Sequence, residues 1–327
     1  MTKTFGAQST TDEVLEGVNL SGKRVLVTGA SAGLGVETCR TLAAHGATVI
    51  GAGARSRQGR TRLPRPYATV RHMAGSLELI ELDLASLKSV RACADALVRA
   101  GKPFDVGDLQ RRRPWRAPRG ITAEGFETQF GTNHLGHFVF VNRIASLIKK
   151  NGGRLVNLSS AGHRFSDVNI DDPNFEHTPY TEFRRLWPLQ DREHSVRGGR
   201  FDRRHKNEGV RATAVHPGGI QTELGRYMTP ELIQGMLKSI EDANKASGAP
   251  PFQWKTIPQG AATTVWSGLR RVRDEAGGKY CEDCHVATLQ ENPDARNGVR
   301  SYALNADHAK ALWTKSEEMV GETFASA

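Results

Sequence analysis

The fold is decided by the stretch Arg24-Val25-Leu26-Val27-Thr28-Gly29-Ala30-Ser31-Ala32-Gly33-Leu34-Gly35. Its first four residues form a short apolar run, which predicts a strand buried on both faces. Residues 36–45 then place Val36, Cys39, Leu42 and Ala43 on one side of a helix, and residues 47–52 form a second apolar strand. A strand, a glycine turn, a helix and a strand within about 30 residues are typical of a dinucleotide-binding βαβ unit.

Each glycine of this turn has a separate expected role. Gly29 permits the tight turn, Gly33 lets the backbone approach a diphosphate, and Gly35 lets helix and strand pack closely. The start of the helix supplies N–H groups and a partial positive charge to phosphates. We therefore expect a diphosphate to bind at Gly29, Ser31, Ala32, Gly33, Leu34 and Gly35. The alternative is a glycine turn that serves packing only.

The glycine spacing, G-x-x-x-G-x-G after Thr28, resembles that of the short-chain dehydrogenase/reductase family. Similar motifs follow in order at residues 82–84, 133–138, 154–160 and 216–222, and the likeness is strongest to the branch of retinol-dehydrogenase-like and WW-domain-oxidoreductase-like proteins. The resemblance runs from about residue 14 to residue 320. It implies an α/β fold, a Rossmann-like doubly wound parallel sheet with helices on both faces. We expect an N-terminal arm over 1–20 and a single domain over 21–327 that ends in a helical extension.

The resemblance also implies a reaction and its residues. Hydride would move between a nicotinamide and a carbonyl or alcohol carbon, with Ser160 hydrogen-bonding the substrate oxygen and Asn133 holding a water that relays protons. Asp83 would lie near the adenine, and Pro217, Gly218 and Thr222 would contact the cofactor. The partner would be an apolar small molecule, because His163, Phe165, Tyr227 and Met228 are expected near the pocket.

The choice of cofactor depends on the end of the second strand. An acidic residue there would bind the ribose hydroxyls and select NAD. None is present, and Arg55 stands nearby to meet a 2′-phosphate. We therefore expect NADP, with NAD as the alternative.

Composition limits the other classes of function. The chain has 327 residues, 38% of them hydrophobic, and lacks a run of 18 apolar residues, so we expect no membrane span. Without an apolar signal core at the N-terminus, a cytoplasmic location is the default expectation. The net charge of +10 is compatible with nucleic acid, but few aromatics alternate with the basic residues. A noncatalytic dinucleotide- or nucleic-acid-binding protein with basic loops is therefore the weaker alternative.

The four cysteines are too few for a disulfide scaffold. Residues 281–285, Cys-Glu-Asp-Cys-His, formally match a haem c attachment site. We reject that interpretation because no export signal is present, and a zinc site would need two further ligands.

Further elements follow from periodicity. We expect strands over residues 77–83, 154–158 and 210–215, and helices over 87–99, 125–150, 229–243, 258–270 and 307–321, with Ser86 as an N-cap. The pattern fails in three arginine-rich segments, at 53–75, 107–120 and 184–200. Residues from Gly107 onward are predicted not to form the interior of a buried parallel strand.

These segments stand where the resembled family keeps its cofactor-selecting loop, its Asn-Ala-Gly motif and its Tyr-x-x-x-Lys motif. Residues 110–113 can be encoded CAA CGC CGG CGT, which one base later reads Asn-Ala-Gly. Residues 186–191 can be encoded CTA TGG CCG CTC CAA GAC, which one base later reads Tyr-Gly-Arg-Ser-Lys. We infer compensated frameshifts; the alternative is a set of divergent basic surface loops.

The chain as written therefore lacks the Tyr-Lys pair. Tyr180 with Arg184 has the right spacing but lies too early in the chain, and arginine does not replace lysine cleanly. Loss of a general acid costs about 10²–10⁴ in rate, so we expect impaired activity. A homo-oligomer is compatible with the resemblance, but the broken helix near Pro188 would disrupt its usual face.

The frameshift hypothesis predicts the coding DNA. Sequencing of the gene should show codons at 110–113 and 186–191 that spell both missing motifs one base later. Synonymous codons that spell neither motif in that frame would rule the hypothesis out.

Overall fold

The computed structural model describes residues 4–54, 74–110, 119–164, 169–180, 200–220, 229–247, 251–270, 276–292 and 295–324. One sheet forms its centre, with strand order β3-β2-β1-β4-β5-β6-β7-β8. All neighbouring pairs are parallel except β7 with β8. The strands are β1 (Arg24–Thr28), β2 (Thr48–Gly53), β3 (Ser76–Glu81), β4 (Val106–Leu109), β5 (Arg154–Leu158), β6 (Arg211–His216), β7 (Tyr280–Glu282) and β8 (His285–Val286).

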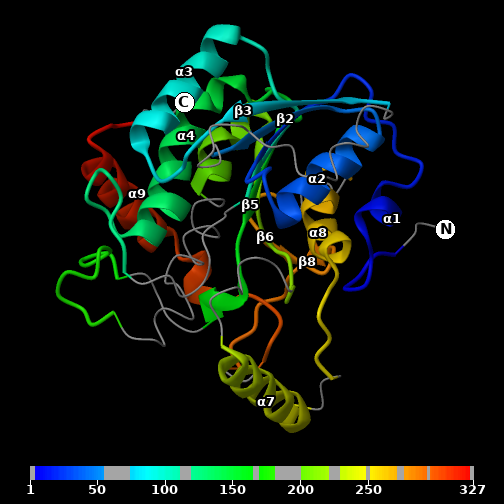
Figure 1. Cartoon of the computed structure of the whole chain (residues 1–327), viewed down its shortest axis with the longest axis vertical. Coiled ribbons are helices and arrows are strands. Elements are labelled where there is room, and N and C mark those ends of the chain that lie inside the picture. The colour runs from blue at the N-terminus through cyan, green and yellow to red at the C-terminus, as the bar shows by residue number, and fades with distance from the viewer. Residues whose placement is uncertain are drawn as a thin grey trace.

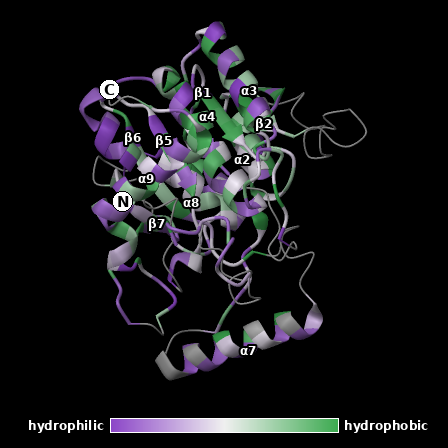
Figure 2. Cartoon of the chain, turned by 90° about the vertical axis from the view of Figure 1, so that its left-hand side faces the viewer, coloured by the Kyte–Doolittle hydropathy of each residue, from purple (hydrophilic) through white to green (hydrophobic). Residues whose placement is uncertain are grey.

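Helices cover both faces of this sheet (Figure 1). On one face lie α1 (Thr11–Leu15), α2 (Gly33–Ala44) and α8 (Ile257–Leu269). On the other lie α3 (Leu87–Ala100), α4 (Gly136–Ile144) and α9 (Ala306–Val320). The arrangement confirms the expected doubly wound α/β fold. A further helix, α7 (Pro230–Ser247), lies apart from the sheet in two perpendicular views (Figures 1 and 2).

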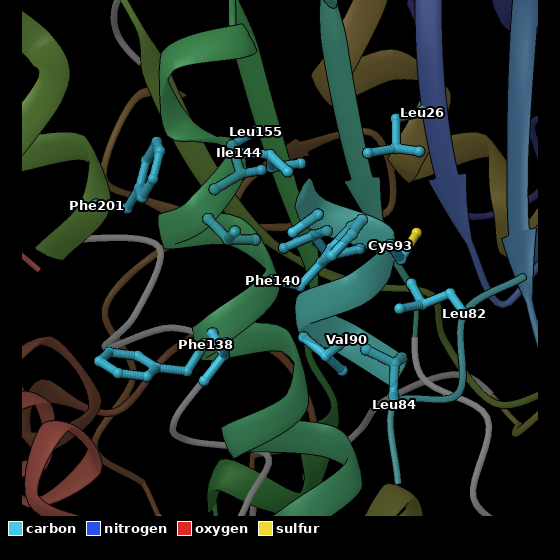
Figure 3. Close-up of a cluster of buried hydrophobic side chains, with 14 of the residues drawn as sticks. Leu26, Leu82, Leu84, Val90, Cys93, Phe138, Phe140, Ile144, Leu155 and Phe201 are labelled. Atoms are coloured by element: carbon cyan, nitrogen blue, oxygen red, sulfur yellow. The ribbon is translucent and has the colours of Figure 1, made fainter. Parts of the chain in front are cut away.

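The alternation of side chains along each strand divides the core into two clusters. Val25, Val27 and Val49 pack toward α2 and α8, whereas Leu26 and Ile50 pack on the opposite face. That second cluster is the larger, and Figure 3 shows Leu26 and Leu155 of the sheet facing Val90 of α3 and Phe140 of α4. Because successive strand residues point to opposite faces, a run apolar on both sides fits only a sheet covered twice.

The N-terminal segment packs on the domain through α1. Val14 and Leu15 are fully buried in the cluster beneath α2 and α8. Thr10 caps α1 in a capping box with Glu13, and the Arg40 guanidinium binds the Asp12 carboxylate at 2.8 Å. The expected polar arm therefore packs against the helices on one face of the sheet through both apolar contacts and an ion pair.

The expected elements occur at their places, with two corrections. Ser86 caps α3 as predicted, since its hydroxyl accepts the Ser89 N–H. The helix expected over 125–150 is shorter: a π-helix over Phe130–Leu135 leads into α4, and a 3₁₀ turn over Ala145–Leu147 follows. At the junction, Gly136 packs against the segment after β3, where a side chain would overlap the Leu84 carbonyl oxygen.

The prediction that residues from Gly107 onward cannot lie in a buried parallel strand is wrong for Gly107 to Leu109. They form β4 between β1 and β5, and all four β4 residues are buried. One oxygen of the Asp108 carboxylate accepts the Gln110 side-chain N–H at 2.6 Å, and the other, Oδ1, is buried without a hydrogen bond to the described residues. Burial raises the pKa of Asp108 to about 7. Most arginines of the three arginine-rich segments lie outside the described residues. In the second segment, for example, the description ends at residue 110 and resumes at residue 119.

No helix in the described part of the chain combines the length and apolar character that crossing a bilayer requires.

Asp108 should make stability depend on pH. Its pKa is raised from 3.8 to about 7 in the folded state, so between these values the folded chain keeps a proton that the unfolded chain releases. The stabilisation of the folded state by protonated Asp108 is fully present below about pH 4. It is lost as pH rises to 7, and the loss is on the order of 4 kcal/mol. In Asp108→Asn this loss should disappear. Urea unfolding at pH 5 and 7 measures it, with the exposed Asp171→Asn as control. An identical pH slope in Asp108→Asn and the unmodified chain would contradict the prediction.

Candidate active site

The candidate site lies at the carboxyl ends of the central strands. In the sheet, β2 and then β3 lie on one side of β1, and β4 and then β5 lie on its other side. The strand order therefore reverses direction between β1 and β4. In open parallel sheets, ligands bind in the crevice at such a reversal. The glycine turn after β1, Gln110 after β4, Ser159 and Ser160 after β5, and Pro217 after β6 all stand at this edge.

The glycine turn needs its glycines for the reasons expected from the spacing. Gly29 has φ of +66° and Gly33 has φ of +57°, values that other residues rarely adopt. A Cβ on Gly35 would lie 2.5 Å from the Gly29 carbonyl oxygen. The turn therefore folds back so tightly on the first turn of α2 that no side chain fits between them.

The start of α2 is open to an anion. Ala32 is the N-cap and makes no side-chain capping hydrogen bond, and the first turn carries no acidic residue. The first N–H groups of a helix lack intrahelical partners, so they remain available. The Ser31 hydroxyl is buried and makes no hydrogen bond to the residues that the structure describes. Leu34 and Ala30 bury their side chains at the same turn.

The adenine side of the site is described only in part. A Cβ on Gly53, the last residue of β2, would lie 3.4 Å from the Ser31 hydroxyl oxygen, so the end of β2 borders the turn. Asp83 is exposed beyond β3, and its carboxylate accepts the Ala85 N–H at 3.0 Å. Arg55 lies outside the described residues, and so does Thr222.

A buried network links β1, β4 and the helix that carries Asn133. The Thr28 hydroxyl oxygen lies 2.9 Å from both the backbone N and the backbone O of Gln110. His137 Nε2 lies 3.2 Å from the same hydroxyl, and its Nδ1 donates to the Asn133 carbonyl oxygen at 3.0 Å. The network sets the depth of Asn133 relative to the end of β1. The sequence motif around Asn133 includes His137, but the spacing of the motif did not reveal that the His137 ring contacts Thr28.

Asn133 lies in the middle of the π-helix, with 1% of its surface exposed. A π-helical turn inserts an extra residue into the helical repeat and is frequent at functional sites. The extra residue changes which side chains face the sheet. A regular helical period in the sequence does not predict that change.

Ser160 follows β5 in a turn held by three aromatic residues. Its hydroxyl accepts the Gly162 N–H at 3.2 Å, and its carbonyl oxygen accepts from His163 Nδ1 at 2.8 Å and from the Tyr280 hydroxyl at 3.4 Å. The Tyr302 hydroxyl donates to the His163 carbonyl oxygen at 2.6 Å. His163 was expected near a substrate pocket, but its ring is fully buried against Tyr280, at 4.7 Å between centroids. Phe165, Tyr227 and Met228 lie outside the described residues.

The Pro217-Gly218 segment is packed against a buried lysine. Gly218 has φ of +90°, and a Cβ there would lie 2.7 Å from Lys255 Cδ. The Lys255 ammonium forms an ion pair with Asp283, and the Lys255 backbone N–H donates to the Gly219 carbonyl oxygen at 2.8 Å. This contact holds the segment at the end of β6.

Tyr180 has a structural partner. Its hydroxyl donates to the Glu127 carboxylate at 3.2 Å, and its ring packs edge-on against Phe175. That carboxylate also accepts the N–H groups of Gln129 and Phe130 at the start of the π-helix. These contacts agree with the expectation that Tyr180 is not the catalytic tyrosine.

The four cysteines form no disulfide with one another. All four are buried free thiols, and burial raises the pKa of Cys281 to about 12 and that of Cys284 to about 11. A protonated thiol is a poor metal ligand. Within the described residues, no cluster of three or more potential metal ligands occurs.

Comparisons with known proteins agree with this geometry. The family model for short chain dehydrogenase matches residues 23–168. The short-chain dehydrogenase/reductase prx1 of Penicillium roqueforti is 31% identical over 315 residues, which span 92% of this chain and 86% of that protein. Human retinol dehydrogenase 14 is also 31% identical over 315 residues, spanning 92% of this chain and 87% of its own. The solved structure of an uncharacterised Mycobacterium paratuberculosis protein matches with a TM-score of 0.67 and 28% identity, covering 94% and 96% of the two chains.

The tight contact at Gly35 predicts a sharp effect of one methyl group. Gly35→Ala should destabilise the chain by about 1–3 kcal/mol and weaken NADPH binding at least tenfold, because the turn must move away from α2. Urea unfolding and NADPH fluorescence measure the two effects.

The matched control is Gly235→Ala. Gly235 is also a helical glycine, but nothing lies within 4 Å of its added Cβ. There alanine should stabilise by about 0.5–1 kcal/mol and leave NADPH binding unchanged. Equal behaviour of the two variants would show that the turn does not require Gly35.

Proposed function

Because the chain belongs to the short-chain dehydrogenase/reductase family, we propose that it binds NADP and descends from an oxidoreductase that interconverts carbonyls and alcohols on apolar small molecules. Its relatives include retinol dehydrogenase 14 and a WW domain-containing oxidoreductase, the latter 29% identical over 338 residues. The observation that carries the proposal is the glycine turn packed on the open start of α2, at the reversal point of a parallel sheet.

The proposed roles follow the geometry. The backbone N–H groups of residues 31–34, with Gly29 and Gly35 shaping the turn, would hold the diphosphate. Asp83 would border the adenine, and Pro217, Gly218 and Thr222 would contact the nicotinamide end. When bound, the nicotinamide supplies or accepts a hydride. The Ser160 hydroxyl would hydrogen-bond the substrate oxygen, while Asn133, held by His137, would position a water.

NADP is favoured over NAD by the end of β2. The strand stops at Gly53 without the acidic residue that would bind ribose hydroxyls, and Arg55 follows within two positions. Among structures with the same fold, a short-chain dehydrogenase from Burkholderia cenocepacia is a complex with NADP, at 21% identity and a TM-score of 0.61.

We further infer that the chain as written binds cofactor but turns over slowly. The Tyr-x-x-x-Lys motif is missing from the sequence, and Tyr180 is engaged with Glu127. Without this motif, the sequence lacks the tyrosine that would exchange the proton beside Ser160 and the lysine that would lower the pKa of that tyrosine. A noncatalytic dinucleotide-binding protein is the second candidate, favoured by this same gap.

Restoring the alternative frame over residues 184–200, so that Tyr-Gly-Arg-Ser-Lys is encoded, should raise kcat. The expected gain is about 10²–10⁴ for apolar aldehydes such as retinal, since a general acid is regained. The loss of absorbance of the reduced nicotinamide as NADPH is oxidised measures kcat in both chains. Equal turnover by both chains, in the presence of intact NADPH binding, would refute the inferred impairment.

A further inference from the structure

A cavity of about 340 Å³ lies where β7 and β8 meet the segment before α9. Aliphatic side chains line most of it, from Val286, Ala287, Leu289, Val299, Ala303 and Leu304. Its volume is at the lower end of the range of about 300–1,000 Å³ found for small-molecule sites.

Two leucines at this cavity are unusually exposed. Leu289 exposes 61% of its surface and Leu304 exposes 43%. Only five large hydrophobic residues are exposed in the described part of the chain, and these two gather at one cavity. Exposed apolar side chains that cluster around a hollow mark a binding surface more often than single ones do.

The polar part of the lining is cationic. Arg203 and Lys279 border the cavity, and its lining residues in the described part of the chain include no aspartate or glutamate. Both cations are exposed, and neither forms an ion pair with the residues that the structure describes. Nearby, the Arg204 guanidinium stacks on the Trp313 ring at 4.3 Å. Charge complementarity therefore favours an anionic group at the rim.

The cavity is separate from the cofactor edge. None of the glycine-turn residues lines it, whereas Tyr280 forms part of its wall and donates its hydroxyl to the Ser160 carbonyl oxygen. A ligand there would lie beside the turn that carries Ser160 without entering the space expected for NADP.

We propose that this cavity binds an apolar molecule with one anionic group, of the class of a medium-chain fatty acid. The alkyl chain lies among the aliphatic side chains, and the carboxylate faces Arg203 and Lys279. This site does not depend on the proposed oxidoreductase activity.

Calorimetric titration of the full chain with dodecanoate, below its micelle concentration, tests the proposal. One molecule should bind per chain, at least tenfold more tightly than dodecyltrimethylammonium, and saturating NADPH should not displace it. No saturable binding, equal binding of the two head groups, or displacement by NADPH would overturn the proposal.

Variants locate the site. Leu289→Asp should weaken dodecanoate binding about tenfold, and the pair Arg203→Ser with Lys279→Ser should reduce the preference for the anionic head group by a similar factor. Ile121→Asp is the matched apolar control, since Ile121 is also 61% exposed but lies outside the cavity. The exposed Lys88→Ser with Arg99→Ser controls for total charge. Losses as large in the controls as in the cavity variants would contradict the assignment.

Discussion

The contact between the Gly29 carbonyl and the backbone of Gly35 is the constraint on which the site depends. It brings the turn after β1 against the first turn of α2, and it leaves the helix start without a side chain over it. The closeness requires a glycine at position 35, and the positive φ of +66° favours a glycine at position 29. Because the sheet reverses its order beside this turn, the open N–H groups face the crevice in which a dinucleotide is expected.

Other parts of the site are positioned relative to this turn by buried hydrogen bonds. Thr28 connects β1 to Gln110 and to His137, and His137 in turn holds the Asn133 carbonyl. On the far side, Tyr280 and His163 hold the carbonyl of Ser160. The two candidate catalytic residues are therefore fixed by residues from β1, α4, β7 and the turn after β5, which are distant in sequence. A polar group buried at such a place needs these partners, because an unsatisfied one costs about 1–3 kcal/mol.

Local patterns predicted most of the fold. The spacing of Gly29, Gly33 and Gly35 and the doubly apolar strands are short-range signals, and the sheet order and helix faces agree with them. The prediction failed at β4, where the residues from Gly107 onward, which lead into a run of arginines, were predicted not to form a buried strand. The one hydrogen bond to the Asp108 carboxylate comes from the Gln110 side chain just after β4, and local composition does not show whether a buried carboxylate will find such a partner. The π-helical turn around Asn133 also escaped prediction, since it departs from the regular helical period.

The central claim is that the start of α2 binds a cofactor diphosphate. A crystal structure of the chain grown with saturating NADPH tests it most directly. We expect diphosphate oxygens within hydrogen-bonding distance of the backbone N–H groups of residues 31–34, with the nicotinamide directed toward Ser160. A diphosphate bound elsewhere, or none at saturation, would contradict the account.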